Sequence, residues 1–256
     1  MNDSNSNNPD GNVIFSGTKE VAENLKFNEA GLQEWFGDSI SSAGKILKIA
    51  QFKGGQSNPT YKITTEKQQF VLRRKPPGIL LPSAHAVDRE YKVITALQQT
   101  EVPVPKTYGL CEDEDVIGTP FFVMDFLDGN IYWDLLLGDK SPAERSDIYA
   151  SKNNVIAQLH MVDYESVGLS DYGKPGNYIA RQVSRWTKQY IASETQDIPA
   201  MNKLIDWLPS NIPDEDETSI VHGDYRLDNM VFNANNNVMG VLDWELSTLG
   251  HPIADF

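Results

Sequence analysis

Two acidic residues and one amide are spaced in a way that suits the handling of a phosphorylated ligand. The run HGDYRLDN carries Asp224 and Asn229, and the run VLDWE that follows it carries Asp243. Carboxylate and amide oxygens are ligands that Mg²⁺ prefers, together with water and phosphate oxygens. Phosphoryl transfer needs metal ions to bridge the phosphates and a carboxylate to orient the attacking hydroxyl. The three residues therefore predict phosphoryl-transfer chemistry at a magnesium site.

The same spacing is typical of one fold. An Asp, an Asn five residues later and a further Asp on the following hairpin form the catalytic-loop and metal-strand arrangement of the protein-kinase fold. Arg226 lies two residues after Asp224, where protein kinases place a lysine. A cation there can reach the transferring phosphoryl group, and arginine can contact that group through two parallel hydrogen bonds. Asp224 and Arg226 are therefore the candidate catalytic residues.

A second signal is a glycine-rich segment between two predicted strands, GGQSNPTYKI. Glycines let backbone N–H groups approach phosphates closely. We expect this loop to cover the phosphates of a nucleotide through Gly54, Gly55, Ser57 and Asn58. A hairpin turn rich in glycine and asparagine is the alternative interpretation. The segment is not a Walker A loop, because no G-K-[ST] follows it.

Two further residues, later in the chain, support the interpretation of this loop as a phosphate-binding loop. The strand-like run FVLR ends in Arg73, and the helical run AVDREYKVITAL carries Glu90. In kinases a basic residue on the third strand binds the α- and β-phosphates and pairs with a helix glutamate. Protein kinases use lysine there, so Arg73 is a departure, and Arg74 or Lys75 could share the role. A solvent-facing position is the alternative for Glu90.

The first part of the chain predicts a small sheet with helices. Short runs rich in Ile, Val, Phe, Tyr and Thr within residues 45–72 are typical of antiparallel strands. A helix is expected from Asn28, as its N-cap, to Phe36, with Gly37 ending it. A second helix is expected at about 86–98, before two further strand-like runs that end with FFVMDF.

Helical periodicity dominates after Phe126, and short strands return near residue 218. Helices are expected at about 142–162, 177–193 and 200–208. The order of elements predicts an α+β, protein-kinase-like fold of two lobes, and a cleft between lobes is the default ligand site. The predicted divisions are a disordered tail at 1–12, an N-lobe at 13–123, a hinge at 124–129 and a mainly helical C-lobe at 130–256.

The acidic composition excludes some classes of partner. The formal net charge is −14, from 22 Lys and Arg against 36 Asp and Glu. Non-specific nucleic-acid binding needs a basic surface, and an anionic membrane repels an acidic one. Cys111 is the only cysteine, so no intramolecular disulfide can form. With no apolar run long enough to span a membrane and no secretory signal, we expect a cytoplasmic protein.

Longer runs resemble a known family. The segment IVHGDYRLDNMVF…VLDWELSTLGHPIADF resembles the catalytic core of the aminoglycoside-phosphotransferase-like enzymes. The runs GGQSNPTYKI, FVLRRKPPGILLPSAHAVDREY and VSRWTKQY are similar to the kinase domains associated with acyl-CoA dehydrogenases. The resemblance extends from about residue 28 to the end of the chain. It implies an enzyme that uses ATP and Mg²⁺ to phosphorylate a hydroxyl on a small-molecule acceptor.

The resemblance also implies roles at matching positions. Asp224 would be the catalytic base, and Asn229 and Asp243 would be metal ligands. FFVMDF would be the hinge, with backbone groups near Met124 and Phe126 meeting adenine. Relatives of this type continue past the ADF run with further helices that help to build the acceptor pocket. The chain ends at this run, so we expect either a fragment or a naturally short protein.

Several other polar residues have both a structural and a functional interpretation. For His222 we favour a structural role over that of a general base, because Asp224 can already act as the base. For His160 we favour a buried core position with its hydrogen bonds made. Glu245 could bind a second metal or make a structural contact. A basic-aromatic helix face could contact an anionic acceptor or be a solvated face with its tryptophan in the core. It comprises Arg181, Arg185, Trp186 and Lys188.

Small-molecule phosphotransfer is thus the leading hypothesis, with a hydroxyacyl-CoA or an aminoglycoside-like compound as acceptor. A nucleotide-binding pseudokinase or scaffold is the alternative. A protein kinase is less favoured, because no A-P-E element or activation loop follows VLDWE.

Overall fold

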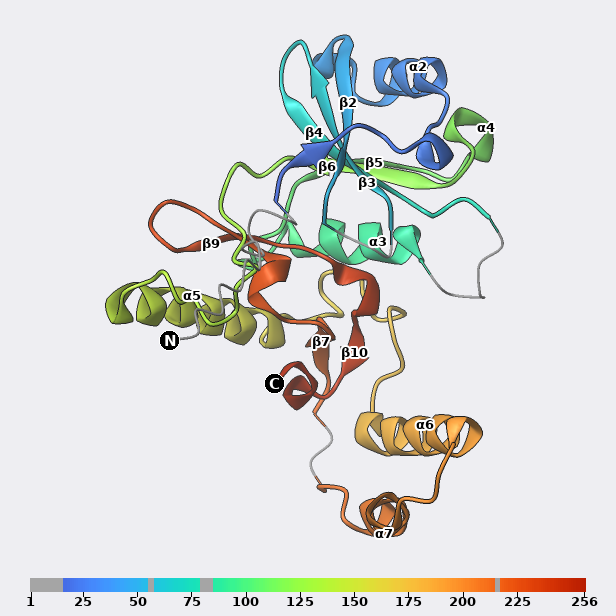
Figure 1. Cartoon of the computed structure of the whole chain (residues 1–256), viewed down its shortest axis with the longest axis vertical. Helices are drawn as coiled ribbons and strands as arrows, with labels where there is room; N and C mark the ends of the chain where they lie inside the picture. The colour runs from blue at the N-terminus through green and yellow to red at the C-terminus, as the bar shows by residue number, and fades with distance from the viewer. Residues whose placement is uncertain (1–15, 55–57, 79–84, 215–216) are drawn as a thin grey trace, which may run out of the picture.

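The computed structural model describes residues 16–54, 58–78, 85–214 and 217–256. These residues form the expected α+β, protein-kinase-like arrangement of two lobes (Figure 1). The predicted tail at 1–12 and the loop residues Gly55 and Ser57 lie outside the described residues. None of the described helices combines the length and the apolar character that crossing a membrane requires.

An antiparallel six-stranded sheet forms the upper lobe in Figure 1. Its strand order is β1-β2-β3-β4-β6-β5. Alternate residues of β3 are buried, which is why the runs rich in β-branched and aromatic residues form strands here. The strands are β1 (Thr18–Lys19), β2 (Ile46–Phe52), β3 (Thr60–Thr65), β4 (Gln69–Arg74), β5 (Thr107–Cys111) and β6 (Phe121–Asp125).

Helices cover both faces of this sheet. On one face lie α2 (Glu29–Ser39) and α4 (Glu114–Ile117), and on the other lies α3 (Val87–Leu97) (Figure 1). Two hydrophobic clusters follow from this layering. The first packs β-strand side chains against α2 and α4, and the second runs from the α3 face into the lower lobe without a break. The second cluster therefore fixes α3 against the lobe that carries HGDYRLDN.

The N-terminal helix confirms one prediction and corrects another. Asn28 caps α2, because its side chain accepts a hydrogen bond from the backbone N–H of Gly31. Gly37 does not end the helix, which continues to Ser39. Glycine inside a helix costs about 1 kcal/mol relative to alanine. Burial of the apolar side chains of Phe36 and Ile40, on either side of Gly37, offsets that free-energy cost.

The lower lobe contains the three predicted helices and two short strand pairs. A capping box between Ser141 and Glu144, followed by a proline in the first turn, starts α5 where the sequence predicts it. Strand β10 was not predicted, because three residues that include a glycine carry no periodic signal. The elements are α5 (Pro142–His160), α6 (Tyr178–Ser193), α7 (Pro199–Trp207), β7 (Ser219–Val221) with β10 (Thr248–Gly250), and β8 (Met230–Phe232) with β9 (Val238–Val241).

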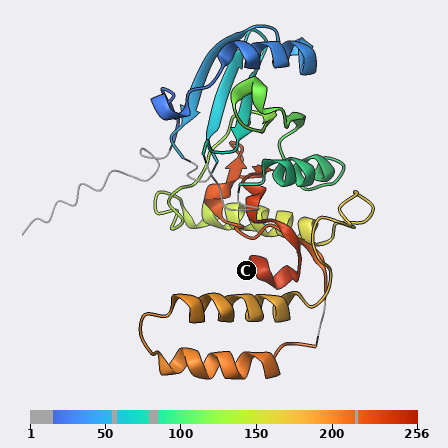
Figure 2. The same cartoon turned by 90° about the vertical axis from the view of Figure 1, so that its right-hand side faces the viewer.

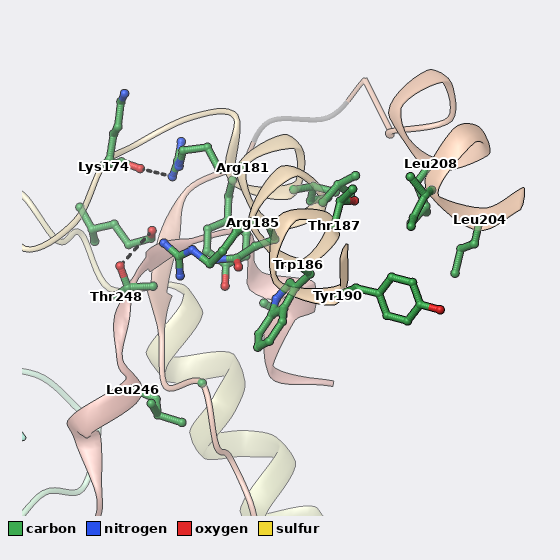
Figure 3. A pocket seen from close by; sticks show the side chains of 18 of the residues that line it. Lys174, Arg181, Arg185, Trp186, Thr187, Tyr190, Leu204, Leu208, Leu246 and Thr248 are labelled. Carbon is green, nitrogen blue, oxygen red and sulfur yellow. Dashed lines mark hydrogen bonds between the residues drawn. The ribbon is translucent and has the colours of Figure 1, made fainter. Parts of the chain in front are cut away.

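Helices α6 and α7 stand apart from the rest of the lobe. Figure 2 shows them side by side below the core, and neither contains a buried residue. Trp186 on α6 is 62% exposed, so the interpretation that placed this side chain in the core is wrong. Several apolar residues of α6, among them Ile179, Val183 and Trp186, line an open groove together with residues of α7 (Figure 3).

Candidate functional site

A cavity of about 350 Å³ lies between the lobes. Strands β2, β4 and β6 and helix α3 contribute to its wall from above, and the segment around the β8–β9 hairpin contributes from below. Apolar side chains of Val71, Ile94 and Leu242 line part of it. Seven of the residues predicted from the sequence also line it: Gly54, Arg73, Glu90, Met124, Phe126, Asn229 and Asp243.

The turn that carries Asp224 has a conformation that needs glycine. Gly223 follows β7 with φ of +85°, and a Cβ atom there would lie 2.8 Å from the carbonyl oxygen of Leu246. Asn229 then closes the loop, because its Nδ2 donates to the backbone oxygen and to Oδ2 of Asp224, both at 2.9 Å. No described group donates a hydrogen bond to Oδ1 of Asn229, so an amide oxygen is left for a ligand.

Asp243 enters the cavity from a strained backbone. It follows β9 with φ of +64°, which is unusual for a residue other than glycine, and such outliers concentrate at functional sites. Its Oδ1 pairs with Nη2 of Arg73. Arg73 reaches it from β4, and its Nε lies 2.7 Å from Oε2 of Glu90 on α3. One guanidinium thus joins the sheet, the helix and the hairpin.

Arg73 is the single cation among three carboxylates in this cluster. The third is Glu245, whose Oε2 lies 3.5 Å from Nη2 of Arg73. Burial alone would lower the pKa of Arg73, but the three carboxylates raise it, so the guanidinium stays charged. Burial raises the pKa of Glu90 to about 7, against the lowering effect of Arg73 and with help from Asp243 and Glu245.

Asn58, from the loop predicted to cover the phosphates, is tied to the same cluster. Asn58 is 1% exposed, and its Nδ2 donates to Oε2 of Glu245 at 3.1 Å. Its Oδ1 lies 3.0 Å from Nδ1 of His85. The side chain of Asn58 is therefore committed to protein partners, and it is absent from the cavity wall that includes Gly54. Glu245 thus makes structural contacts with Asn58 and Arg73, as in the alternative to a second metal ligand.

Arg226 and His222 lie on either side of Asp224 in the sequence, and they differ in their exposure to solvent. Arg226 is half-exposed, pairs with Asp228, and keeps its Nε 3.8 Å from Oδ1 of Asp224. His222 is fully buried, and its Nε2 lies 2.9 Å from the carbonyl oxygen of Leu242. Burial lowers the pKa of His222 and favours the neutral ring, which agrees with a structural role.

Asp255 is a residue that the sequence reasoning missed. Its buried carboxylate accepts hydrogen bonds from the backbone N–H groups of His222, at 3.0 Å, and Gly223, at 2.7 Å. Nε2 of His160 on α5 lies 2.9 Å from the same group. Burial would raise the pKa of Asp255, but these hydrogen bonds lower it overall. The residue lies in the ADF run of the resemblance, and no spacing rule connects it to the catalytic loop.

The metal-binding capacity of the site depends on further ligands. Among the described residues, no group of three or more His, Cys, Asp and Glu side chains could hold a metal ion. Asn229 and Asp243 both line the cavity and offer an amide and a carboxylate oxygen. Mg²⁺ is commonly held by one or two protein oxygens, with water and substrate phosphates completing its shell. The donor set therefore fits magnesium that arrives with a triphosphate.

Known proteins resemble this chain over most of its length. A solved structure described as a putative aminoglycoside phosphotransferase from Ralstonia eutropha JMP134 is 54% identical, with a TM-score of 0.82. The match covers 90% of this chain and 68% of that one. The ternary complex of streptomycin, ATP and the phosphotransferase APH(2")-IIa shares the fold, at 19% identity and a TM-score of 0.63, over 90% of this chain and 74% of that one.

Curated relatives are longer proteins. Human acyl-CoA dehydrogenase family member 11 is 47% identical over 249 residues, which is 94% of this chain and 32% of the relative. The chain spans between 20% and 32% of the length of the curated relatives that it matches. The model of the phosphotransferase enzyme family matches residues 48–256, which include every candidate residue described above. The chain belongs to the phosphotransferase enzyme family.

Proposed function

We propose that this chain transfers the γ-phosphate of ATP to a hydroxyl group of a small molecule. The observation that carries the proposal is the convergence of Arg73, Asn229 and Asp243 on one interlobe cavity. They come from a strand of the upper lobe and two loops of the lower lobe. Such a set supplies one cation and two oxygen ligands for a triphosphate with its metal.

The cavity offers a place for each part of the nucleotide. We assign the adenine to the backbone of Met124 and Phe126, because apolar side chains surround that end. The phosphates would lie under Gly54 and beside Arg73. We keep Gly55 and Ser57 as expected phosphate contacts, while Asn58 would hold the loop through Glu245 rather than contact phosphate.

Magnesium would bind to Asn229 and Asp243 and neutralise charge on the phosphates. Nη2 of Arg73 pairs with Oδ1 of Asp243. With phosphates and metal in the cavity, Asp243 would hold the metal, and Nη2 of Arg73 would be free to contact a phosphate. Nε of Arg73 contacts Glu90 and not Asp243, so this contact with α3 would be kept.

Asp224 is proposed as the base of the transfer step. Its carboxylate takes the proton of the acceptor hydroxyl while that oxygen forms a bond to the γ-phosphorus. The bond between the γ-phosphorus and the bridging oxygen breaks, and ADP leaves with the electron pair. Arg226 is half-exposed and can leave Asp228 to contact the transferring group.

Two classes of acceptor are consistent with the relatives. The relationship to acyl-CoA dehydrogenase family members suggests a hydroxyacyl-CoA. The structural neighbour that binds streptomycin suggests an aminoglycoside-like compound. A nucleotide-binding scaffold without turnover is the alternative, and it requires ATP binding without transfer to any hydroxylated acceptor.

The first prediction concerns Asp224→Asn. The substitution removes the proposed base but keeps an oxygen for the hydrogen bond from Asn229. We expect kcat to fall by about 10²-fold or more, while the dissociation constant of ATP with Mg²⁺ stays within about twofold. ADP release in the presence of hydroxylated acceptors and calorimetric ATP titration measure the two quantities. Retained kcat would remove Asp224 from the mechanism.

The second prediction concerns the pKa of Glu90. The folded-state pKa of about 7 lies above the ordinary value of 4.5, so the folded protein binds more protons between these values. Its stability contribution is therefore lost as pH rises toward and through 7. Relative to Glu90→Gln, the free energy of unfolding of the unsubstituted protein should fall by on the order of 2 kcal/mol from pH 5.5 to 8. Urea unfolding without nucleotide measures it, and parallel pH profiles contradict it.

The third prediction concerns Asp255→Asn. An asparagine offers an N–H group where the His222 and Gly223 amides need an acceptor, so the catalytic loop should lose its position. We expect kcat to fall by about tenfold or more with the ATP dissociation constant little changed, and stability to fall by about 1–3 kcal/mol. Asp206→Asn, on the exposed surface of α7, is the matched control. A variant with lower stability but normal kcat would restrict Asp255 to folding.

A further inference from the structure

The first described residues of the chain reach the interlobe cavity. They belong to the N-terminal segment, residues 16–27, which precedes α2 and is dark blue in Figure 1. Ser16, Gly17 and Thr18 line the cavity together with Phe52 and Gly54. The match to the phosphotransferase family model begins only at residue 48. The cavity wall therefore includes an element that lies outside the matched family core.

Strand β1 attaches this element to the end of β2 that lies at the cavity. Thr18 pairs with Phe52, the last residue of β2. The backbone N–H of Lys53 donates to the carbonyl oxygen of Gly17 at 3.1 Å. A strand of two residues does not cover the edge of a seven-residue strand, so protection of the sheet edge does not explain the position of β1. Its place beside the cavity points to a role in binding a ligand.

The N-terminal segment presents two side-chain hydroxyl groups at the cavity. Gly17 has φ of +80°, a conformation that favours glycine, and it turns the chain out of β1 so that Ser16 lines the cavity as well as Thr18. Among the described residues, neither hydroxyl has a hydrogen-bond partner. A hydroxyl group can both donate and accept a hydrogen bond, so the two side chains are available to a polar ligand.

A buried arginine holds the other end of the N-terminal segment. Arg74 on β4 is 2% exposed, and its Nη2 donates to the carbonyl oxygen of Leu25 at 3.0 Å. The hydroxyl of Tyr61 donates to the same oxygen, also at 3.0 Å. The guanidinium lies over the ring of Phe27, 5.0 Å from its centroid, and no described carboxylate pairs with it. Because a buried cation is costly unless other groups satisfy it, these contacts keep the N-terminal segment docked on the sheet.

The N-terminal segment meets the cavity between the places proposed for adenine and for the phosphates. Phe52, opposite Thr18 in the sheet, stacks on Phe126 at the adenine end, with ring centroids 6.3 Å apart. Gly54, at the phosphate end, follows Phe52 by two residues and also lines the cavity. The ribose joins the base to the phosphates. It is therefore the part of the nucleotide that would lie beside Ser16 and Thr18.

We propose that the hydroxyl groups of Ser16 and Thr18 bind the ribose of the nucleotide and thereby select ribonucleotides over deoxyribonucleotides. This proposal rests on the function proposed above and adds a recognition element from outside the matched family core. The ribose hydroxyls exchange hydrogen bonds with these two side chains. Arg74 and the pairing of β1 with β2 hold the two side chains at the cavity.

Nucleotide binding tests this inference without any need for turnover. ATP, 2′-deoxy-ATP and 3′-deoxy-ATP, each with Mg²⁺, are titrated calorimetrically into the full chain. We expect ATP to bind about three- to tenfold more tightly than at least one of the two deoxynucleotides, because one net hydrogen bond is worth about that factor. The deoxynucleotide that binds more weakly identifies the recognised hydroxyl. Equal affinity for all three nucleotides would overturn the proposal.

Substitutions locate the contact. Ser16→Ala combined with Thr18→Val removes both hydroxyls and keeps a β-branched side chain in β1. ATP should then bind only as tightly as the weaker deoxynucleotide, whose own affinity should change by less than about twofold. Thr64→Val, on β3 and away from the cavity wall, is the control for the same chemical change. A purely structural role of β1 predicts that the double variant weakens all three nucleotides alike, and that result, or no effect at all, contradicts the proposal.

Failure of the proposed function has a different signature. If no nucleotide binds to the unsubstituted chain, transfer from ATP is contradicted, and ribose recognition with it. If ATP binds and no affinity depends on the sugar, only ribose recognition is contradicted. If ATP binds with the expected ribose preference but no hydroxylated acceptor stimulates ADP release, ribose recognition stands and the phosphotransfer proposal falls.

Discussion

The structure depends on one buried guanidinium. Arg73 contacts Glu90 on α3, Asp243 after β9 and Glu245 two residues further along. Removing one partner from such a buried pair costs several kcal/mol, because the other charge is left uncompensated. The interaction therefore links the two lobes across the cavity. It also has an excess of negative charge that a bound metal would relieve.

The lower lobe holds the proposed catalytic loop, which carries Asp224, from the opposite side. Asp255 accepts from the backbone of His222 and Gly223, while Nε2 of His222 meets the carbonyl oxygen of Leu242 just before Asp243. The loop with Asp224 and the turn with Asp243 are thus positioned by hydrogen bonds that do not use either carboxylate. Rigid backbone behind a site reduces the reorganisation that a transfer step requires.

Local patterns predicted many of the elements, although β10 was missed. Strands β2 to β4, helix α3 and the cap of α2 followed from composition, periodicity and a single asparagine. The long-range contacts did not follow, because Asn58 and Glu245 are 187 residues apart and His160 and Asp255 are 95 apart. Nor did the exposure of Trp186, since periodicity assigns a side chain to a helix face and does not say what covers that face.

The measurement that tests the central claim most directly is the dependence of ATP affinity on Mg²⁺. Calorimetric titration of ATP into the chain, with and without Mg²⁺, should show at least about tenfold tighter binding with the metal, and Asp243→Asn should abolish that difference. Asp206→Asn should keep it. Equal ATP affinity with and without Mg²⁺, or a magnesium effect that Asp243→Asn leaves intact, would contradict the assignment of the interlobe cavity as the nucleotide and metal site.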